Sequence, residues 1–300
     1  MSLVKSNTRW VLFLASSDVN PEDRHILDLV YGLSSLERAG IRPENISVYV
    51  DGKDRTNINN LFQIASPNIY NIQLTQDFFI DMQNNKYDNL VMFVTGHGSE
   101  KGIDAAKPIT PYRLLESIKS SPKLDQAIIY LGQCFAGIFN YVKASRTGKN
   151  GPNIIFIGAT ELQESLSTST AETFPTDPNP VSWQANLFLL HVFKWISSPF
   201  DVDGDSVHTI MDSYKYAGVM TNRSHKNIKA NEFIRLMGAY GDLREAQRAA
   251  GTPTGNPSID MMSKVRLQAM ETQYLRSSYI NNVHQECWIL NSIPAQSIEI

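Results

Sequence analysis

The chain has 300 residues, of which 42% are hydrophobic and 19% are charged, and its formal net charge at pH 7 is −3. This balance is typical of a globular protein and argues against a disordered chain. The length allows one large domain, or one domain with an appendage. The slightly acidic charge gives no reason to expect nucleic acid or an anionic membrane as a partner.

The number of cysteines and the lengths of the apolar runs indicate in which cellular compartment the protein works. Cys134 and Cys287 are too few for a disulfide framework, and no CxxC metal-binding spacing occurs. Such usage is typical of a reducing compartment. The apolar run 10–15 is shorter than a signal-peptide core, and no segment approaches the roughly 20 apolar residues of a membrane span. We therefore expect a cytoplasmic protein without a membrane partner.

The first half of the chain alternates apolar runs with amphipathic segments. After the strand 10–15, Asn20 and Pro21 suit the N-cap and first residue of a helix that ends near Gly40. With the next strand, this helix predicts a right-handed crossover in a parallel sheet and thus an α/β fold. Residues 53–70 are polar and ambiguous. Strands are expected at 46–50, 90–94, 127–131 and 154–157, and helices at 74–83, 111–119 and 135–144.

The second half becomes increasingly helical. A polar loop over 168–180 precedes an apolar interior helix over 185–196. A further helix follows Asp205, and later patterns predict helices over 230–249 and 258–277 and a short strand over 287–290. We expect a core of residues 1–221 and a helical C-terminal extension of residues 222–300 that packs on the core or regulates it.

Two apolar strands end in reactive residues between glycines. The strand 90–94 leads to Gly96-His97-Gly98, and the strand 127–131 leads to Gly132-Gln133-Cys134. Because ligands of open α/β sheets bind outside the carboxyl ends of the strands, we expect His97 and Cys134 in one crevice. Cys134 could then attack a carbonyl, with His97 as base and the N–H groups of Gly98 and Cys134 as oxyanion donors. The alternative is a turn histidine and a buried structural cysteine.

This pattern resembles the caspase-like superfamily of cysteine peptidases, which includes caspases, metacaspases and legumains. The resemblance rests on a strand followed by His97-Gly98 and a strand followed by Cys134-x-x-Gly137, and it covers roughly residues 9–220. It implies a three-layer fold, with helices on both faces of a mostly parallel sheet of about six strands. It also implies a catalytic dyad of His97 and Cys134.

The closest pattern is that of bacterial legumain- or caspase-like stand-alone proteases. This resemblance implies a protein or peptide substrate, no required cofactor, a regulatory protein partner and a role in a signalling or defence cascade. The loops 146–153 and 168–180 are then candidate activation or gating segments.

The loop after strand 154–157 resembles the legumain-type loop that lines the substrate cleft. Two departures concern the pocket: Gly132 stands where legumains carry an acidic residue, and residues 16–18 lack their pocket arginine. A carboxylate from Asp18 or Glu164 would favour Lys or Arg over Asp or Asn at the P1 position of the substrate. Loop solvation and helix capping are the alternatives. The candidate substrate-binding residues are Asp18, Gly132, Thr160, Glu161, Glu164 and Ser165.

An acidic cluster suggests a calcium loop. Asp201, Asp203, Asp205 and Asp212 match its first, third, fifth and twelfth positions, but the sixth is Ser206 instead of glycine and the twelfth is not glutamate. Calcium ligation by Asp201, Asp203 and Asp205 is therefore one interpretation. The other is a turn in which Asp205 caps the next helix.

The sequence thus predicts a cysteine endopeptidase. Two alternatives stay open. One is a transamidase or ligase of the same superfamily, whose acyl acceptor is an amine. The other is a non-catalytic interaction module that keeps the fold.

Overall fold

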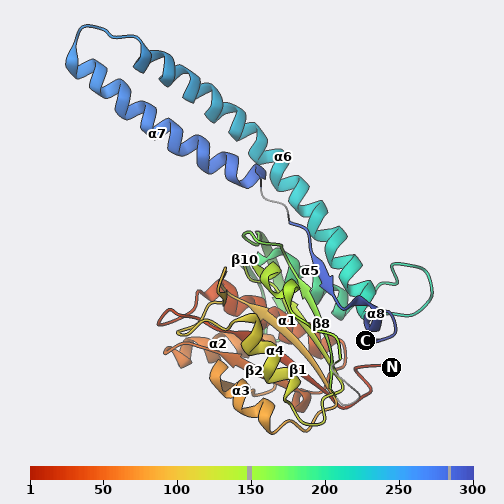
Figure 1. Cartoon of the computed structure of the whole chain (residues 1–300). Helices are drawn as coiled ribbons and strands as arrows, with labels where there is room; N and C mark the ends of the chain where they lie inside the picture. The colour runs from red at the N-terminus through yellow and green to blue at the C-terminus, as the bar shows by residue number, and fades with distance from the viewer. Residues whose placement is uncertain (147–150, 283–284) are drawn as a thin grey trace. The chain divides into compact units, whose positions relative to one another are not determined.

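The computed structural model describes residues 1–146, 151–282 and 285–300 (Figure 1). Its central sheet has seven strands in the order β11-β8-β7-β4-β1-β2-β3, one more than about six. All neighbours pair in parallel except β11, which runs antiparallel to β8. The predicted α/β class with a mostly parallel sheet is confirmed. The strands are β1 Thr8–Leu14, β2 Ile46–Val50, β3 Ile72–Gln73, β4 Asn89–Thr95, β7 Gln126–Leu131, β8 Asn153–Gly158 and β11 Trp288–Leu290.

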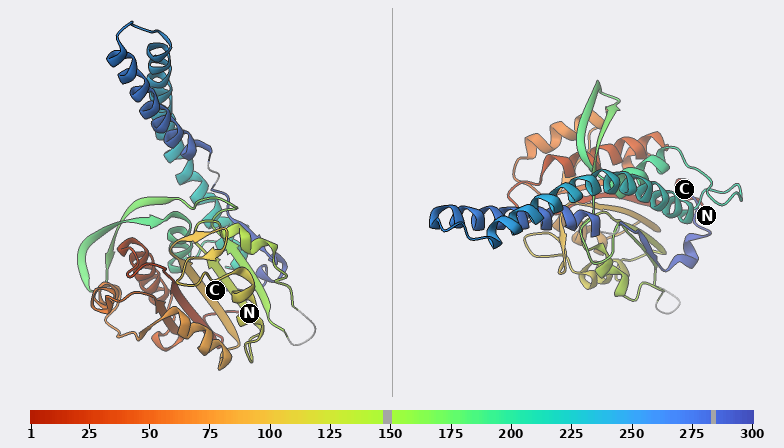
Figure 2. Two further views of the ribbon diagram at one scale, coloured as in Figure 1. Left: turned by 60° about the vertical axis from the view of Figure 1, so that its left-hand side comes forward. Right: turned by 90° about the horizontal axis from the view of Figure 1, so that it is seen from above.

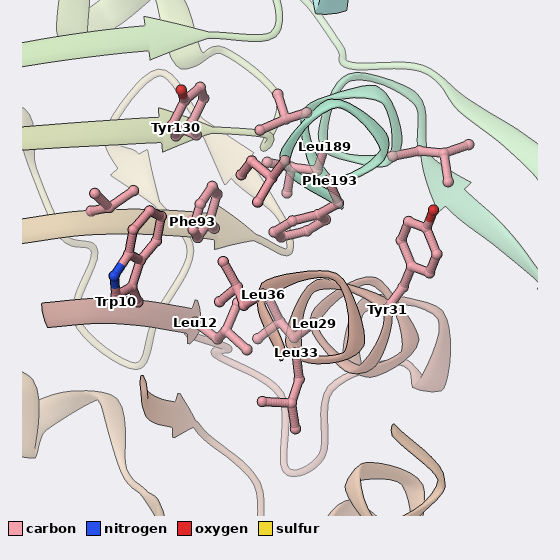
Figure 3. Packing of buried hydrophobic residues seen from close by; sticks show 14 of the residues in the cluster. Trp10, Leu12, Leu29, Tyr31, Leu33, Leu36, Phe93, Tyr130, Leu189 and Phe193 are labelled. Carbon is pink, nitrogen blue, oxygen red and sulfur yellow. The ribbon is translucent and has the colours of Figure 1, made fainter. Parts of the chain in front are cut away.

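Helices cover both faces of this sheet, because alternate residues of each buried strand point to opposite sides. Trp10 and Leu12 of β1 belong to the core beneath α1, α2 and α5, whereas Val11 and Phe13 belong to the core beneath α3 and α4. Figure 3 shows the first core, where Phe93 stacks on Tyr130 at 5.2 Å between ring centroids. These helices are α1 Asp23–Arg38, α2 Arg55–Ala65, α3 Thr75–Gln83, α4 Pro111–Lys119 and α5 Leu187–Ser197.

The strand order reverses between β1 and β4. From β1 the chain moves outward through β2 and β3, and it then returns to β4 on the other side of β1. Leu14 and Thr95, which end these two strands, are partners in the register. In open α/β sheets the ligand crevice lies at such a switch point, outside the carboxyl ends of the strands.

Three local predictions need correction. Helix α1 begins at Asp23 with Glu22 as N-cap, and Asn20 instead accepts a hydrogen bond from the amide of Asp54, 2.7 Å away. The ambiguous segment 53–70 contains α2. The helix expected over 135–144 is only a short 3₁₀ helix, Ala136–Tyr141, and another, Pro43–Asn45, precedes β2.

The loop predicted over 168–180 is wrong, because these residues belong to an antiparallel hairpin of β9 Ser167–Phe174 and β10 Asp177–Asn186 (Figure 2). Pro178 and Pro180 lie where the register shifts between Asp177 and Val181, a position that tolerates a missing N–H. Trp183 is buried against Tyr31 of α1, with 5.9 Å between ring centroids. A second, small hairpin joins β5 Gly98–Ser99 to β6 Gly102–Ile103.

The chain divides into two compact units. Residues 1–221 and 285–300 form the first, and residues 222–284 the second. The extension expected over 222–300 is therefore wrong for its last residues: β11 pairs with β8, and the indole of Trp288 donates to the carbonyl of Thr160 at 2.9 Å. The short helix α8, Ser292–Ala295, also belongs to the first unit.

The second unit is helical. Its helices come from α6, Ile210–Gly251, which starts in the first unit, and from α7, Pro257–Asn282. The helices predicted after Asp205 and over 230–249 are one continuous helix, since no Pro interrupts the segment. Tyr240 and Tyr274 join α6 to α7 with 5.9 Å between ring centroids.

Among the described residues, no helix combines the length and the apolar character that are needed to cross a membrane.

Candidate active site

His97 and Cys134 follow neighbouring parallel strands. Val94 of β4 and Leu131 of β7 are register partners, and the amide of Gly132 still donates to the carbonyl of Val94 at 2.8 Å. Both strands end at the same edge, and both residues line one cleft of about 320 Å³. The wall combines residues that follow four strands: Arg24 and His25 after β1, His97 and Gly98 after β4, Gly132 and Cys134 after β7, and Glu164 and Ser165 after β8.

The imidazole of His97 is held by a carboxylate. Its Nε2 lies 2.8 Å from Oε1 of Glu22, and its ring meets His25 edge to face with 5.0 Å between centroids. When Nε2–H donates to this carboxylate, Nδ1 keeps its lone pair and can accept a proton. This tautomer is the one that a general base at this position requires.

Glu22 is anionic at neutral pH. The pKa of its carboxyl group is lowered to about 2, mainly by the hydrogen bond from Arg24 and further by the one from His97, although desolvation acts in the opposite direction. Nε of Arg24 lies 2.6 Å from Oε2 and its Nη2 lies 3.3 Å from Oε1, so Arg24 and His97 share Oε1. Glu22 therefore offers a fixed negative charge beside the imidazole.

Cys134 is a half-buried thiol. Burial raises the pKa of this thiol above its usual range, and the charge of Glu164 raises it further, whereas the hydrogen bond from Ser165 lowers it. The amide of Ser165 lies 3.3 Å from Sγ. At neutral pH the resting group is accordingly the protonated thiol, and attack on a carbonyl needs a base to remove the proton.

Gly98 lies close against the backbone of Cys134. A Cβ on Gly98 would lie 2.2 Å from the carbonyl oxygen of Cys134, so only glycine fits this approach. Phe135 has φ of 56°, a left-handed conformation that turns the chain sharply after the cysteine. The Cys134 amide donates to no acceptor on another described residue. The proposed oxyanion donors, Gly98 and Cys134, are thus adjacent.

Only some predicted substrate-binding residues line the cleft. Gly132, Glu164 and Ser165 do so, and the carbonyl of Gly132 accepts a hydrogen bond from Asn186 at 2.6 Å. Asp18 does not line it but lies on an exposed loop, where its amide donates to the hydroxyl of Ser16.

Thr160 and Glu161 serve the packing of the fold instead. Thr160 is fully buried and its carbonyl holds the indole of Trp288. The carbonyl of Glu161 accepts from the amide of Gly137 at 3.1 Å, and the backbone of Glu161 leaves no space for a Cβ on that glycine. Neither residue lines the cleft.

Four residues at or beside the cleft were not predicted from the sequence: Glu22, Arg24, His25 and Asn186. The first three begin α1, where charged residues usually serve the helix terminus. A signal existed, because a charged Glu-x-Arg-His segment directly follows the loop after the first buried strand. Asn186 caps α5 by accepting from the amide of Leu189 at 2.9 Å, while its Nδ2 reaches the cleft.

No family model matches the chain, and no curated protein matches it.

The acidic loop contributes no residue to the lining of the cleft and has its own hydrogen bonds. Ligand oxygens of Asp201, Asp203 and Asp205 lie within 4.8 Å of one another. However, the carboxylate of Asp201 accepts from the amides of Gly204 and Ser206, and Asp203 pairs with Lys215 at 2.7 Å. These contacts account for the turn, and calcium ligation stays a prediction.

Proposed function

We propose that this chain is a cysteine endopeptidase of the caspase-like type, with Cys134 as nucleophile and His97 as general base and acid. The observation that supports this proposal most is that His97 and Cys134 follow neighbouring parallel strands and line one cleft, with Gly98 against the backbone of Cys134. The three-layer arrangement with helices on both faces of the sheet agrees with this proposal.

The proposed reaction begins with Sγ of Cys134 attacking the scissile carbonyl carbon while His97 Nδ1 takes the thiol proton. The N–H groups of Gly98 and Cys134 hold the tetrahedral oxyanion. The C–N bond then breaks, and His97 gives its proton to the departing amine. Water, activated by the same imidazole, hydrolyses the thioester and restores the thiol. Glu22 keeps His97 in the required tautomer throughout.

The charges of the cleft favour a basic P1 residue. Arg24 lies in the wall, but its guanidinium is neutralised by Glu22. Glu164 also lies in the wall, and no described cation forms an ion pair with its carboxylate. An incoming Lys or Arg side chain would supply the missing charge. We therefore propose cleavage after Lys or Arg, with Glu164 as the carboxylate of the P1 pocket. Asp18, the other candidate for this role, does not line the cleft.

A peptide library with every residue at P1 tests the proposal on the wild type, Cys134→Ala and Glu164→Gln. We expect cleavage after Lys and Arg, none by Cys134→Ala, and at least tenfold slower cleavage of basic substrates by Glu164→Gln, since a charge-assisted bond is worth about 1.5–3 kcal/mol. Undiminished turnover by Cys134→Ala would overturn the mechanism. Cleavage after Asp or Glu that is lost in Arg24→Gln would overturn the pocket assignment alone.

Two further measurements separate the alternatives. A peptidyl acyloxymethyl ketone should label Cys134 in the folded wild type, and a folded protein that stays unlabelled would indicate a non-catalytic module. Addition of a small amine to the reaction identifies a transamidase, because the acyl group would then appear on the amine and not as the free acid.

A further inference from the structure

His25 is a buried imidazole without a hydrogen-bond partner. Its residue is 5% exposed, and neither Nδ1 nor Nε2 makes a hydrogen bond to any described residue. The nearest carboxylate, Asp28, lies 3.8 Å from Nδ1, beyond hydrogen-bond distance. Burying unpaired polar nitrogens is costly, and such a group in a cleft wall calls for an explanation.

Two further possible metal ligands lie close to His25. One ligand atom each from Glu22, His25 and His97 lies within 4.8 Å of the other two. In a tetrahedral zinc site with bonds near 2.0 Å, ligand atoms are about 3.3 Å apart, so modest side-chain rotation would close the set. Two imidazoles and one carboxylate, with a fourth position left open, are a donor set that suits Zn²⁺.

The surroundings support this donor set. A metal-bound histidine usually directs its other N–H towards a carboxylate, and Asp28 occupies that place for Nδ1 of His25. Asp28 is itself fixed, because its Oδ2 accepts from the hydroxyl of Thr95 at 2.8 Å and its Oδ1 from the indole of Trp183 at 3.0 Å. Arg24 holds both oxygens of Glu22, with Nε 2.6 Å from Oε2 and Nη2 3.3 Å from Oε1, and this positive charge weakens metal binding.

We propose that Glu22, His25 and His97 bind a divalent zinc ion that reversibly inhibits the enzyme. A metal on Nε2 of His97 fixes the ring proton on Nδ1, so the imidazole can no longer accept the proton of Cys134. The inhibition rests on the proposed peptidase activity, whereas the metal site does not. Its coordination needs no thiol, because Cys134 is not among the three converging residues.

Metal binding is tested on Cys134→Ala protein, which has no thiol in the cleft, with Co²⁺ as a coloured probe and Zn²⁺ as competitor. We expect one equivalent of Co²⁺ per chain, a d–d spectrum without a thiolate charge-transfer band, and displacement by Zn²⁺. Adding His25→Phe keeps the buried ring and should weaken binding at least about 100-fold, since even outer-shell changes cost 10- to 100-fold. His208→Phe, at an exposed histidine outside the cluster, is the matched control.

Glu22→Gln in the same background supplies a second variant in case His25→Phe fails to fold, which circular dichroism would reveal. It should weaken binding about tenfold or more, because the amide lacks the charge of the carboxylate. Absence of binding by Cys134→Ala, or equal affinity with and without His25, would overturn the site.

The inhibitory role is measured on the wild type against His25→Phe, each relative to its own metal-free rate. Micromolar Zn²⁺ should inhibit the wild type reversibly, with recovery on chelation, and His25→Phe should need at least tenfold more Zn²⁺. Equal sensitivity would overturn the inhibitory role. A protein that binds metal yet cleaves no peptide would refute the proposed function and its inhibition but not the metal site.

Discussion

His97 and Glu22 meet across the carboxyl ends of neighbouring strands, with Nε2 of the imidazole 2.8 Å from Oε1 of the carboxylate. His97 follows β4 and Glu22 follows β1, so the contact spans the point where the strand order reverses. In the proposed mechanism, Glu22 takes the place of the orienting third group that a nucleophile–base pair commonly uses. It is a positioning residue in the proposed mechanism.

Glu22→Ala should lower kcat/KM at least tenfold, a part of the roughly 10²–10⁴ that general acid–base catalysis contributes. Glu22→Gln should lose less, because the amide oxygen can still accept from Nε2–H of His97. For both variants kcat and KM are measured separately, and we expect the loss in kcat. Asp18→Ala, an exposed carboxylate outside the cleft, is the control, and a loss as large as that of Glu22→Ala would refute the assignment.

The raised pKa of Cys134 predicts how its reactivity depends on pH. Because the pKa lies above the ordinary 9.0, the thiolate fraction at pH 7 to 9 is smaller than in the unfolded chain and grows about tenfold per pH unit. Alkylation of the metal-free native protein by iodoacetamide should follow this rise.

Peptide mass spectrometry separates the two cysteines in this experiment. Burial raises the pKa of Cys287 to about 12, so this thiol should react more slowly than Cys134 at every pH. Both should react faster at pH 8 in denaturant. A rate at Cys134 that is already constant between pH 6 and 8 would instead indicate a preformed thiolate–imidazolium pair.

Gly98→Ala should abolish most activity. The added methyl group would lie 2.2 Å from the carbonyl of Cys134, so the backbone must move and the Gly98 N–H leaves its place. Removing one oxyanion donor costs about 10²–10³ in kcat. Gly238→Ala is the matched control, since nothing lies within 4 Å of its added Cβ in α6. Thermal unfolding of both variants separates lost catalysis from lost folding.

Gln285 positions the loop that holds Cys134. Its Nε2 donates to the carbonyl of Ala159 at 3.1 Å, and its Oε1 accepts from the amide of Leu166 at 2.8 Å. Between these anchors lies Ser165, whose amide donates to Sγ of Cys134. Gln285→Ala should reduce the alkylation rate of Cys134 several-fold at pH 8. It should also destabilise the fold by about 1 kcal/mol, because the partly buried amide of Leu166 loses its hydrogen bond.

Two further variants help to interpret the Gln285→Ala measurement. Gln285→Glu keeps the acceptor for Leu166 but not the donor for Ala159, so it should rescue part of the alkylation rate. Gln296→Ala removes an exposed glutamine elsewhere in the same terminal segment and should change neither the rate nor the stability. An unchanged alkylation rate in Gln285→Ala would show that the loop holds Ser165 in place without Gln285.

The sequence was informative where strands are buried on both faces. Continuous apolar runs located β4 and β7, and their glycine-rich ends located His97 and Cys134. The hairpin of β9 and β10 was missed because most of its residues are polar and two prolines interrupt β10. Its burial comes from a few residues, such as Trp183 against α1, and a half-exposed strand gives a weak pattern.

The position of Glu22 and His25 beside His97 depends on strand order. Glu22 and His25 look like ordinary residues of a helix start until β1 is known to lie beside β4. The path of the loop also matters: Asp18 follows β1, as His25 does, but Asp18 does not line the cleft. Local patterns locate the ends of strands, whereas long-range pairing decides which of those ends become neighbours.

The return of the chain to the sheet after residue 284 changes how the molecule would respond to being cut. Strand β11 covers the edge of β8, and Trp288 fills the space in front of Gly158. A nick within residues 222–284 would leave both fragments of the first unit joined by this pairing, so a cleaved protein can keep its core. A truncation at residue 221 would instead expose the edge of β8 and invite aggregation.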